Sequence, residues 1–240
     1  MDGGQTQSAR LIVIEGIDGS GSTTQVHRLF AHLRTKGHAA FVTHEPSDGP
    51  VGMLIRLALA KRLLGPNFEF HDPGEMVETS GTALDEFTMA LLFAADRADH
   101  AATQILPNLR RGRHVLSDRY LLSSLAYQGL TCEHEWLRAI NRNAPRPDLT
   151  IFLDVDPEVA HTRMRANRWH RDLYEETDQQ RLIRKAYHEI LARDYPEIGP
   201  VKSVDAARNA DEVAVEIAQV VDAFLATGEI GSATGDLALF

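Results

Sequence analysis

The chain has 240 residues, of which 43% are hydrophobic and 25% are charged, a balance typical of a globular protein with one large core. A formal net charge of -9 disfavours a nucleic-acid partner, because proteins that bind nucleic acids usually present a basic face. One cysteine, Cys132, no apolar stretch of membrane-spanning length and no signal-peptide core predict a cytoplasmic protein without disulfides or membrane contact.

Apolar runs typical of strands alternate along the chain with segments of helical periodicity. We expect strands at residues 11–15, 39–43, 114–117, 150–154 and 201–204, and helices at residues 23–36, 51–63, 85–110, 133–143, 157–167, 178–194 and 211–226. Strands joined through helices pair in parallel by right-handed crossovers. This alternation therefore predicts an α/β fold in which a five-stranded parallel sheet lies between layers of helices.

One domain is expected over residues 1–240, with its core at about residues 10–226, because the sequence shows no internal repeat and no second set of core elements. Residues 65–81 are polar and carry glycine and proline, which predicts a surface insertion. Residues 227–240 are glycine-rich without periodicity, which predicts a mobile tail.

Residues 15–25 follow the first expected strand directly and lead into the first expected helix. Strand, glycine-rich turn and helix form the layout of a phosphate-binding P-loop, in which backbone N–H groups and the helix dipole point at phosphate oxygens. Gly16, Gly21 and Thr23 match the pattern G-x-x-x-x-G-K-[ST], but Ser22 occupies the lysine position. Glycine-rich turns after strands also occur without a ligand. Here strand, spacing, threonine and helix agree, and they predict a P-loop NTPase-type three-layer sandwich that binds a nucleotide.

Asp118 and Arg119 directly follow the expected strand 114–117, at the edge of the sheet where α/β proteins bind their ligands. The Asp118 carboxylate, opposite the Thr23 hydroxyl, would hold Mg²⁺ through water, and Arg119 would grip a phosphate with two hydrogen bonds. An acid and a base after a strand can equally form a surface ion pair. The P-loop beside them is what favours a binding site.

Phe93 and Arg97 are one helical turn apart, so a ring and a guanidinium could hold the base and the phosphate of one nucleotide. The spacing alone fits a core phenylalanine and a solvated arginine better, so this interpretation stays open.

Arginines crowd into one short segment of the chain: Arg163, Arg165, Arg168 and Arg171. Such a segment, with its neighbours at residues 163–176, can close as a lid over a transferring phosphoryl group and neutralise its charge. It can equally be a solvated helix face.

Four segments, in this order and spacing, resemble the thymidylate kinase family: residues 14–19 (I-E-G-I-D-G), residues 93–97 (F-A-A-D-R), residues 118–129 (with D-R-Y, S-S and A-Y-Q-G) and residues 147–154 (P-D-L-T-I-F-L-D). The resemblance runs from residue 11 to residue 226 and separates the chain from adenylate and guanylate kinases. It implies transfer of the ATP γ-phosphoryl group to dTMP, giving dTDP, with Mg²⁺ as cofactor. It also implies a homodimer.

The resemblance implies individual roles as well. Phe93 would stack on thymine, Arg97 would hold the thymine edge, Arg119 would bind the dTMP phosphate, Asp18 would contact the sugar hydroxyl and Tyr127 would crowd the 2′ position. The full dTMP site would be Glu45, Phe93, Arg97, Arg119, Ser124, Tyr127, Gln128 and Tyr174. The ATP site would be Gly16, Asp18, Gly19, Ser20, Gly21, Ser22, Thr23, Thr24 and Arg208. The expected catalytic residues are Asp18, Asp118, Arg168 and Arg171, and the expected metal ligands are Thr23 and Asp118.

Three features depart from the family pattern. Ser22 replaces the P-loop lysine, His44 and the pair at 47–48 replace an arginine and a Gly-Gly pair around Glu-Pro, and the insertion at 65–81 is longer than expected. Losing a lysine contact to the transferring phosphoryl group removes about 3–4 kcal/mol of transition-state stabilisation, which a lid arginine can replace. The retained dTMP-side residues favour an active kinase. A non-catalytic nucleotide-binding protein and a kinase for another nucleoside monophosphate are the alternatives.

Overall fold

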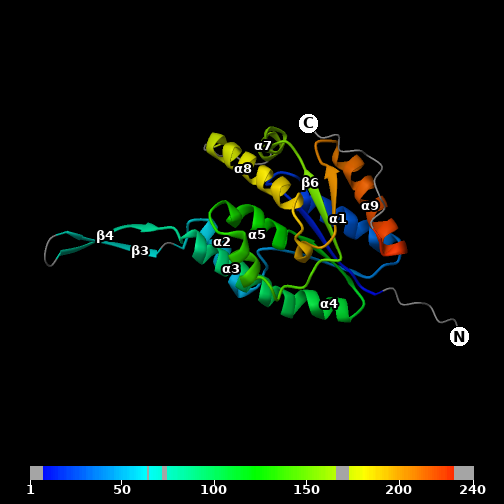
Figure 1. Ribbon diagram of the computed structural model, residues 1–240, viewed down its shortest axis with the longest axis horizontal. Coiled ribbons are helices and arrows are strands. Elements are labelled where there is room, and N and C mark those ends of the chain that lie inside the picture. The colour runs from blue at the N-terminus through cyan, green and yellow to red at the C-terminus, as the bar shows by residue number, and fades with distance from the viewer. Residues whose placement is uncertain (1–7, 64, 72–74, 166–172, 230–240) are drawn as a thin grey trace.

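A five-stranded, all-parallel sheet in the order β2-β5-β1-β6-β7 forms the centre of the molecule. The computed structural model (Figure 1) describes residues 8–63, 65–71, 75–165 and 173–229, with the backbone alone described for 65–71, 75–82, 165 and 173–176. The strands of the sheet are β1 (Leu11–Gly16), β2 (Ala40–His44), β5 (His114–Asp118), β6 (Leu149–Asp154) and β7 (Val201–Asp205). The expected parallel sheet of a P-loop NTPase-type sandwich is confirmed.

Helices cover both faces of this sheet. In Figure 1, α1 and α9 lie on one face, and α4, α5 and α8 lie on the other. The helices are α1 (Ser22–Thr35), α2 (Pro50–Leu59), α3 (Glu86–His100), α4 (Leu106–Arg110), α5 (Leu121–Tyr127), α6 (His134–Ile140), α7 (Pro157–Arg165), α8 (Leu173–Leu191) and α9 (Ala210–Thr227). No helix in the described part of the chain combines the length and apolar character needed to cross a membrane.

Strand β1 is buried along its whole length, because β5 and β6 pair with it on either side and helices cover both of its faces. Its register aligns Ile14 with Asp118 of β5 and with Ile151 of β6. The carboxyl ends of β1 and β5 therefore meet at one edge of the sheet. The loop that follows β1 and the Asp118 side chain consequently lie together, where ligands of parallel sheets bind.

Apart from shifts in where helices begin and end, the structure differs from the expected elements in three places. Residues 65–81 contain an antiparallel hairpin of β3 (Gly65–His71) and β4 (Glu75–Thr82), which projects away from the sheet in Figure 1. The single helix expected over 85–110 is α3, a π-helical segment (Ala101–Ile105) and α4. Helix α5 was not expected at all. Its last residue leads directly into a 3₁₀ turn (Gln128–Leu130), so it is too short to show a clear period.

Candidate active site

The loop between β1 and α1 holds its shape through two glycines with positive φ. Gly21 precedes α1 with φ 94°, a left-handed conformation, and accepts a hydrogen bond of 3.0 Å from the Gln25 N–H. Gly19 has φ 79°, and a Cβ there would lie 2.6 Å from the carbonyl oxygen of Ala160. Only glycine meets both conditions at Gly19. The first turn of α1 contains no acidic residue, so the positive end of its dipole stays available for an anion.

Thr23 and Asp118 form the polar centre of the site. The Thr23 hydroxyl donates to Asp118 Oδ2 at 2.5 Å, while Asp118 Oδ1 is buried and has no hydrogen-bond partner among the described residues. A buried carboxylate oxygen without a partner is costly unless a ligand satisfies it. The described residues contain no group of three or more His, Cys, Asp or Glu side chains arranged to hold a metal. Two protein oxygens, completed by water and phosphate, are the donor set that Mg²⁺ accepts in nucleotide sites.

Arg119 joins this centre to the predicted acceptor side. Its backbone adopts φ 70°, which is rare for a residue with a side chain, and its N–H donates to Ile14 O at 2.9 Å. The guanidinium forms an ion pair of 2.5 Å with Asp18 and lies 5.0 Å from the centre of the Tyr127 ring. Burial raises the pKa of Tyr127 to about 12, so its hydroxyl stays protonated. That hydroxyl has no hydrogen-bond partner among the described residues and is a donor available to a ligand.

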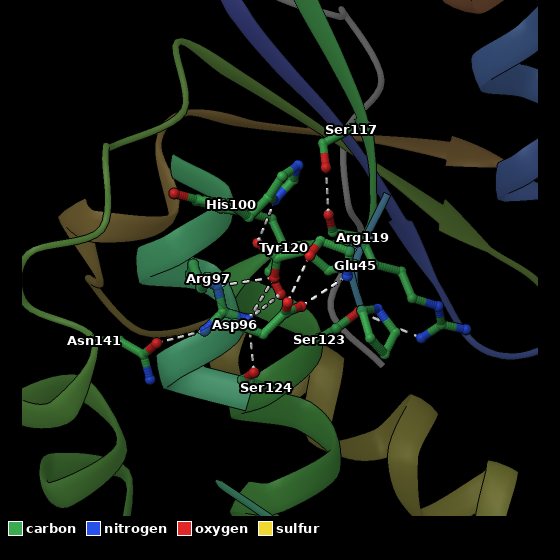
Figure 2. A network of polar contacts seen from close by, with 12 residues as sticks. Glu45, Asp96, Arg97, His100, Ser117, Arg119, Tyr120, Ser123, Ser124 and Asn141 are labelled. Carbon is green, nitrogen blue, oxygen red and sulfur yellow. Dashed lines mark hydrogen bonds and ion pairs between the residues drawn. The ribbon is translucent and has the colours of Figure 1, made fainter. Parts of the chain in front are cut away.

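Arg97 is the hub of a buried polar network on α3 (Figure 2). Its guanidinium is 1% exposed and pairs with Glu45 at 2.8 Å. It also donates to Asn141 Oδ1 at 2.5 Å and to Ser124 Oγ at 2.8 Å. His100 contacts the other Glu45 oxygen at 3.2 Å. The structure thus brings three predicted dTMP-site residues, Glu45, Arg97 and Ser124, into direct contact, with the Arg97 guanidinium bound to protein partners.

Two further predicted acceptor residues lie near this network. Phe93 is half-buried on α3, one turn before Arg97. Gln128 is buried, and its Oε1 atom has no partner among the described residues. Buried polar atoms without partners in the described chain fall mostly on predicted site residues: Ser20, Asp118, Tyr127 and Gln128. Such atoms favour a site built for a polar ligand.

A cavity of about 1280 Å³ opens along the P-loop and gathers most of the predicted ATP site. Its lining includes the predicted residues Asp18, Gly19, Ser20, Gly21, Ser22, Thr23, Thr24, Asp118, Arg119 and Arg208. Gly16 does not line it, because Gly16 packs against the Ser20 side chain, which would lie 2.6 Å from a Cβ at that position. A smaller cavity of about 240 Å³ extends past Asp118 and Arg119 to Glu45 and His44. Arg168 and Arg171 lie outside the described residues, as does the Tyr174 side chain.

Three residues in or beside the site were not predicted from the sequence to take part in it. Glu15 is the next-to-last residue of β1 and is buried. It accepts hydrogen bonds from the Tyr120 N–H at 2.8 Å and from Ser123 Oγ at 2.5 Å, which ties β1 to the start of α5. Gln180 of α8 forms two hydrogen bonds with Asp18. Its Oε1 atom accepts from the Asp18 N–H at 3.1 Å, and its Nε2 atom donates to the Asp18 carboxylate at 3.2 Å. Lys61 lines the large cavity. Glu15 alone carried a signal, because a carboxylate inside an apolar strand is expensive without partners.

Comparisons with known proteins agree with this geometry. A family model described as thymidylate kinase matches residues 14–70 and 74–217. A probable thymidylate kinase of Pyrobaculum aerophilum is 39% identical over 211 residues, which are 88% of this chain and 95% of that protein. A probable thymidylate kinase of Pyrococcus abyssi is 39% identical over 215 residues (88% and 94%), and a thymidylate kinase of Bifidobacterium longum is 40% identical over 162 residues (65% and 72%). The chain belongs to the thymidylate kinase family.

Proposed function

We propose that this protein transfers the γ-phosphoryl group of ATP to dTMP, giving dTDP for dTTP biosynthesis. The observation that carries the proposal is the Thr23–Asp118 pair. It leaves a buried carboxylate oxygen unsatisfied beside a P-loop, in a chain of the thymidylate kinase family. Thr23 and Asp118 would hold Mg²⁺, which when bound neutralises part of the charge on the ATP phosphates.

The chain's own groups position the two nucleotides. The N–H groups of residues 19–24, in the P-loop and the first turn of α1, would bind the ATP phosphates, and Arg208, which lines the same cavity, would meet the adenine end of ATP. Arg119 exchanges its Asp18 partner for the dTMP phosphate. Phe93 stacks on the thymine base, and Arg97 holds Ser124 and Glu45 in place around the thymidine. Asp18 and Tyr127 contact the sugar, and Gln128 and Tyr174 complete the pocket.

The transfer itself needs no covalent enzyme intermediate. A dTMP phosphate oxygen attacks the γ-phosphorus, and the new P–O bond forms while the bond from that phosphorus to the β–γ bridging oxygen breaks. ADP leaves with the electron pair. No proton has to move, because the attacking phosphate is largely ionised near neutral pH. The protein's contribution is alignment and charge neutralisation, to which the lid arginines Arg168 and Arg171 contribute on closing.

A coupled assay of ADP release with dTMP, dUMP, dCMP, dGMP and UMP tests the proposal. We expect a preference for dTMP over purine and ribose substrates of up to ~10⁴-fold, because a site that reads polar edges loses paired contacts when the wrong base or sugar enters. Equal rates on dGMP or UMP would mean a kinase for another nucleoside monophosphate. No turnover of any of them, with ATP still bound, would mean a non-catalytic nucleotide-binding protein. The retained acceptor-side residues and the family relationship disfavour both alternatives.

We also propose that the chain folds as one domain and forms a homodimer. Several large apolar side chains are exposed on α2 and α3, two helices that pack against each other: Met53, Leu54, Leu57, Leu59, Phe87 and Leu91. Apolar groups gathered on neighbouring helices favour a protein–protein contact. A second copy of this chain is the partner that the family relationship supports.

A further inference from the structure

The cations around the large cavity differ in what they already bind. In the described part of the chain, the lysine and arginine side chains that line it are Lys61, Arg119, Arg163 and Arg208. Arg119 is paired with Asp18 at 2.5 Å. Arg163 donates to the backbone carbonyls of Ala207 and Arg208 at 3.2 Å, and Arg208 is paired with Glu216.

Lys61 is the exception. No ion pair or side-chain hydrogen bond joins it to any residue that the structure describes. Its side chain is exposed, so its ammonium can reach a ligand without first breaking a contact. An ammonium on a four-carbon stem is a compact charge that adjusts to a phosphate as it moves.

The backbone of Lys61 is also unusual. The residue lies just after the end of α2 with φ 54°, and its N–H donates to Ala58 O at 2.9 Å. This left-handed position after a helix is usually occupied by glycine, because a Cβ is disfavoured there. Glycine would fit this backbone conformation better than lysine. A lysine found there despite the strain indicates a functional role for its charged side chain.

Ser22 supplies the reason for such a use. It lines the same cavity as Lys61 and stands at the P-loop position where a lysine normally contacts the β- and γ-phosphates. The cavity therefore lacks the lysine charge that a P-loop usually supplies to the phosphates. Lys61, which has no side-chain partner in the described part of the chain, lines the same cavity.

We propose that Lys61 replaces the missing P-loop lysine and contacts the γ-phosphoryl group during its transfer. This inference rests on the proposed function. The ammonium keeps all its protons. It stabilises the charge that develops as the bond to the bridging oxygen breaks and the bond to the dTMP oxygen forms. Lys61 and the lid arginines would act from different segments of the chain.

The experiment compares Lys61→Gly, Lys61→Gln and Lys61→Arg with the parent enzyme in steady-state turnover of ATP and dTMP. Arg62→Ala is the matched control, because Arg62 is the exposed cation next in sequence and does not line the cavity. We expect kcat to fall by ~10²-fold in the Gly and Gln variants, with the KM for dTMP nearly unchanged, as for loss of one transition-state contact. Lys61→Arg keeps part of the rate. Lys61→Gly should melt no lower than the parent, since glycine suits its backbone conformation.

Ser22→Lys completes the test, because it restores charge at the original position. In the Lys61→Gly background, Ser22→Lys should recover most of the lost kcat. Parent-like turnover in both neutral variants overturns the inference. A raised dTMP KM at unchanged kcat, which would place Lys61 on the acceptor phosphate, overturns it too, as does a rate loss that Ser22→Lys fails to recover.

The experiments distinguish a failure of the proposed function from a failure of this inference about Lys61. If the parent turns over no nucleoside monophosphate, the kinase assignment is wrong. Titration of a non-hydrolysable ATP analogue against the parent and Lys61→Gly then still tests the phosphate contact. A roughly tenfold weaker binding in Lys61→Gly, with Arg62→Ala unchanged, supports the contact, and equal binding removes it.

Discussion

The Arg97 guanidinium is buried and paired with Glu45, and we propose that Arg97 supports both the stability of the fold and the binding of dTMP. We expect Arg97→Ala to weaken dTMP binding with little effect on ATP, since Arg97 lies outside the P-loop cavity. The same change should lower the free energy of unfolding by about 3–5 kcal/mol, because it strands the Glu45 carboxylate without its partner. Separate titrations of each nucleotide and a urea melt measure the two effects.

The substitution Glu45→Gln separates the effect of Arg97 on stability from its effect on dTMP binding. Added to Arg97→Ala, it removes the stranded charge and should restore part of the stability while dTMP binding stays weak. Recovery of dTMP affinity together with stability would show that Arg97 acts only through the fold. Loss of ATP affinity with dTMP affinity intact would contradict the acceptor-side assignment.

The site residues that could be placed from the sequence belong to motifs whose position in the fold is known in advance. Thr23 and Asp118 meet because a P-loop and the end of an adjacent parallel strand always lie at one edge of the sheet. The burial of Arg97 could not be predicted, because its partner Asn141 lies directly after α6, which no sequence motif connects to α3. Lys61 was invisible for the same reason, since its place in the cavity depends on where α2 ends.

At the level of elements, the five strands of the central sheet were predicted well. The signal is clearest for β1 and β6, whose apolar runs reflect burial on both faces of the sheet. Helix ends were less accurate. Helix α2 ends at Leu59 rather than at 63, and its last turn leads into the strained Lys61 conformation. The β3–β4 hairpin was predicted only as an insertion. Polar and apolar residues alternate over residues 67–71 of β3, but this stretch is short, and β4 does not repeat the pattern.

Strand β5 carries a pH-sensitive contact at its first residue. His114 is buried and its Nδ1 accepts a hydrogen bond of 3.1 Å from the Arg10 N–H, which requires a neutral ring. Burial, followed by the nearby charges of His38 and Arg10, lowers the pKa of His114 below its usual value of 6.5, although Asp148 opposes the shift. Protonation therefore favours the unfolded chain. The stability that depends on neutral His114 is complete above pH 6.5 and is lost as pH falls from there toward the folded-state pKa.

We expect His114→Asn to flatten the fall in melting temperature between about pH 7.5 and about pH 5.5, because the Asn oxygen can accept the same hydrogen bond but does not titrate. Melting temperatures across this range, measured for both proteins, test the point. His27→Asn, at an exposed position on α1, is the control and should leave the parent slope in place. An equal slope in His114→Asn would assign the acid sensitivity to another group.

The β3–β4 hairpin should be dispensable for folding. Its two strands pair with each other, and Gly65 pairs with Thr82, so the chain enters and leaves the hairpin at neighbouring points. We expect replacement of residues 66–81 by a two-residue turn to shift the melting temperature by only a few degrees, because β3 and β4 form a two-stranded sheet separate from the central one. Calorimetry and turnover of dTMP check the variant. A normal melt with a much reduced kcat would instead assign the hairpin a part in the reaction.

At the level of the whole molecule, dimerisation through α2 and α3 can be tested by placing charged residues on the exposed apolar faces of these helices. Leu57 and Leu91 are 38% and 50% exposed on these helices, and we expect a Leu57→Glu, Leu91→Glu double variant to sediment as a monomer while the parent sediments as a dimer. Val215→Glu, at a 57% exposed apolar position on α9, should remain dimeric. A parent that stays monomeric at all concentrations, or a double variant that stays dimeric, excludes this interface.

The central place of β1 in the sheet has a consequence for how the protein is made. Leu11 pairs with Val115 and Ile14 pairs with Ile151, so the strand that carries the P-loop leaves the ribosome long before either of its neighbours exists. Until then its apolar run stays unpaired, and exposed strand edges of this kind promote aggregation. During translation, β1 therefore stays unpaired until β5 and β6 have been synthesised, and we expect the nascent chain to become resistant to aggregation only once β6 has emerged.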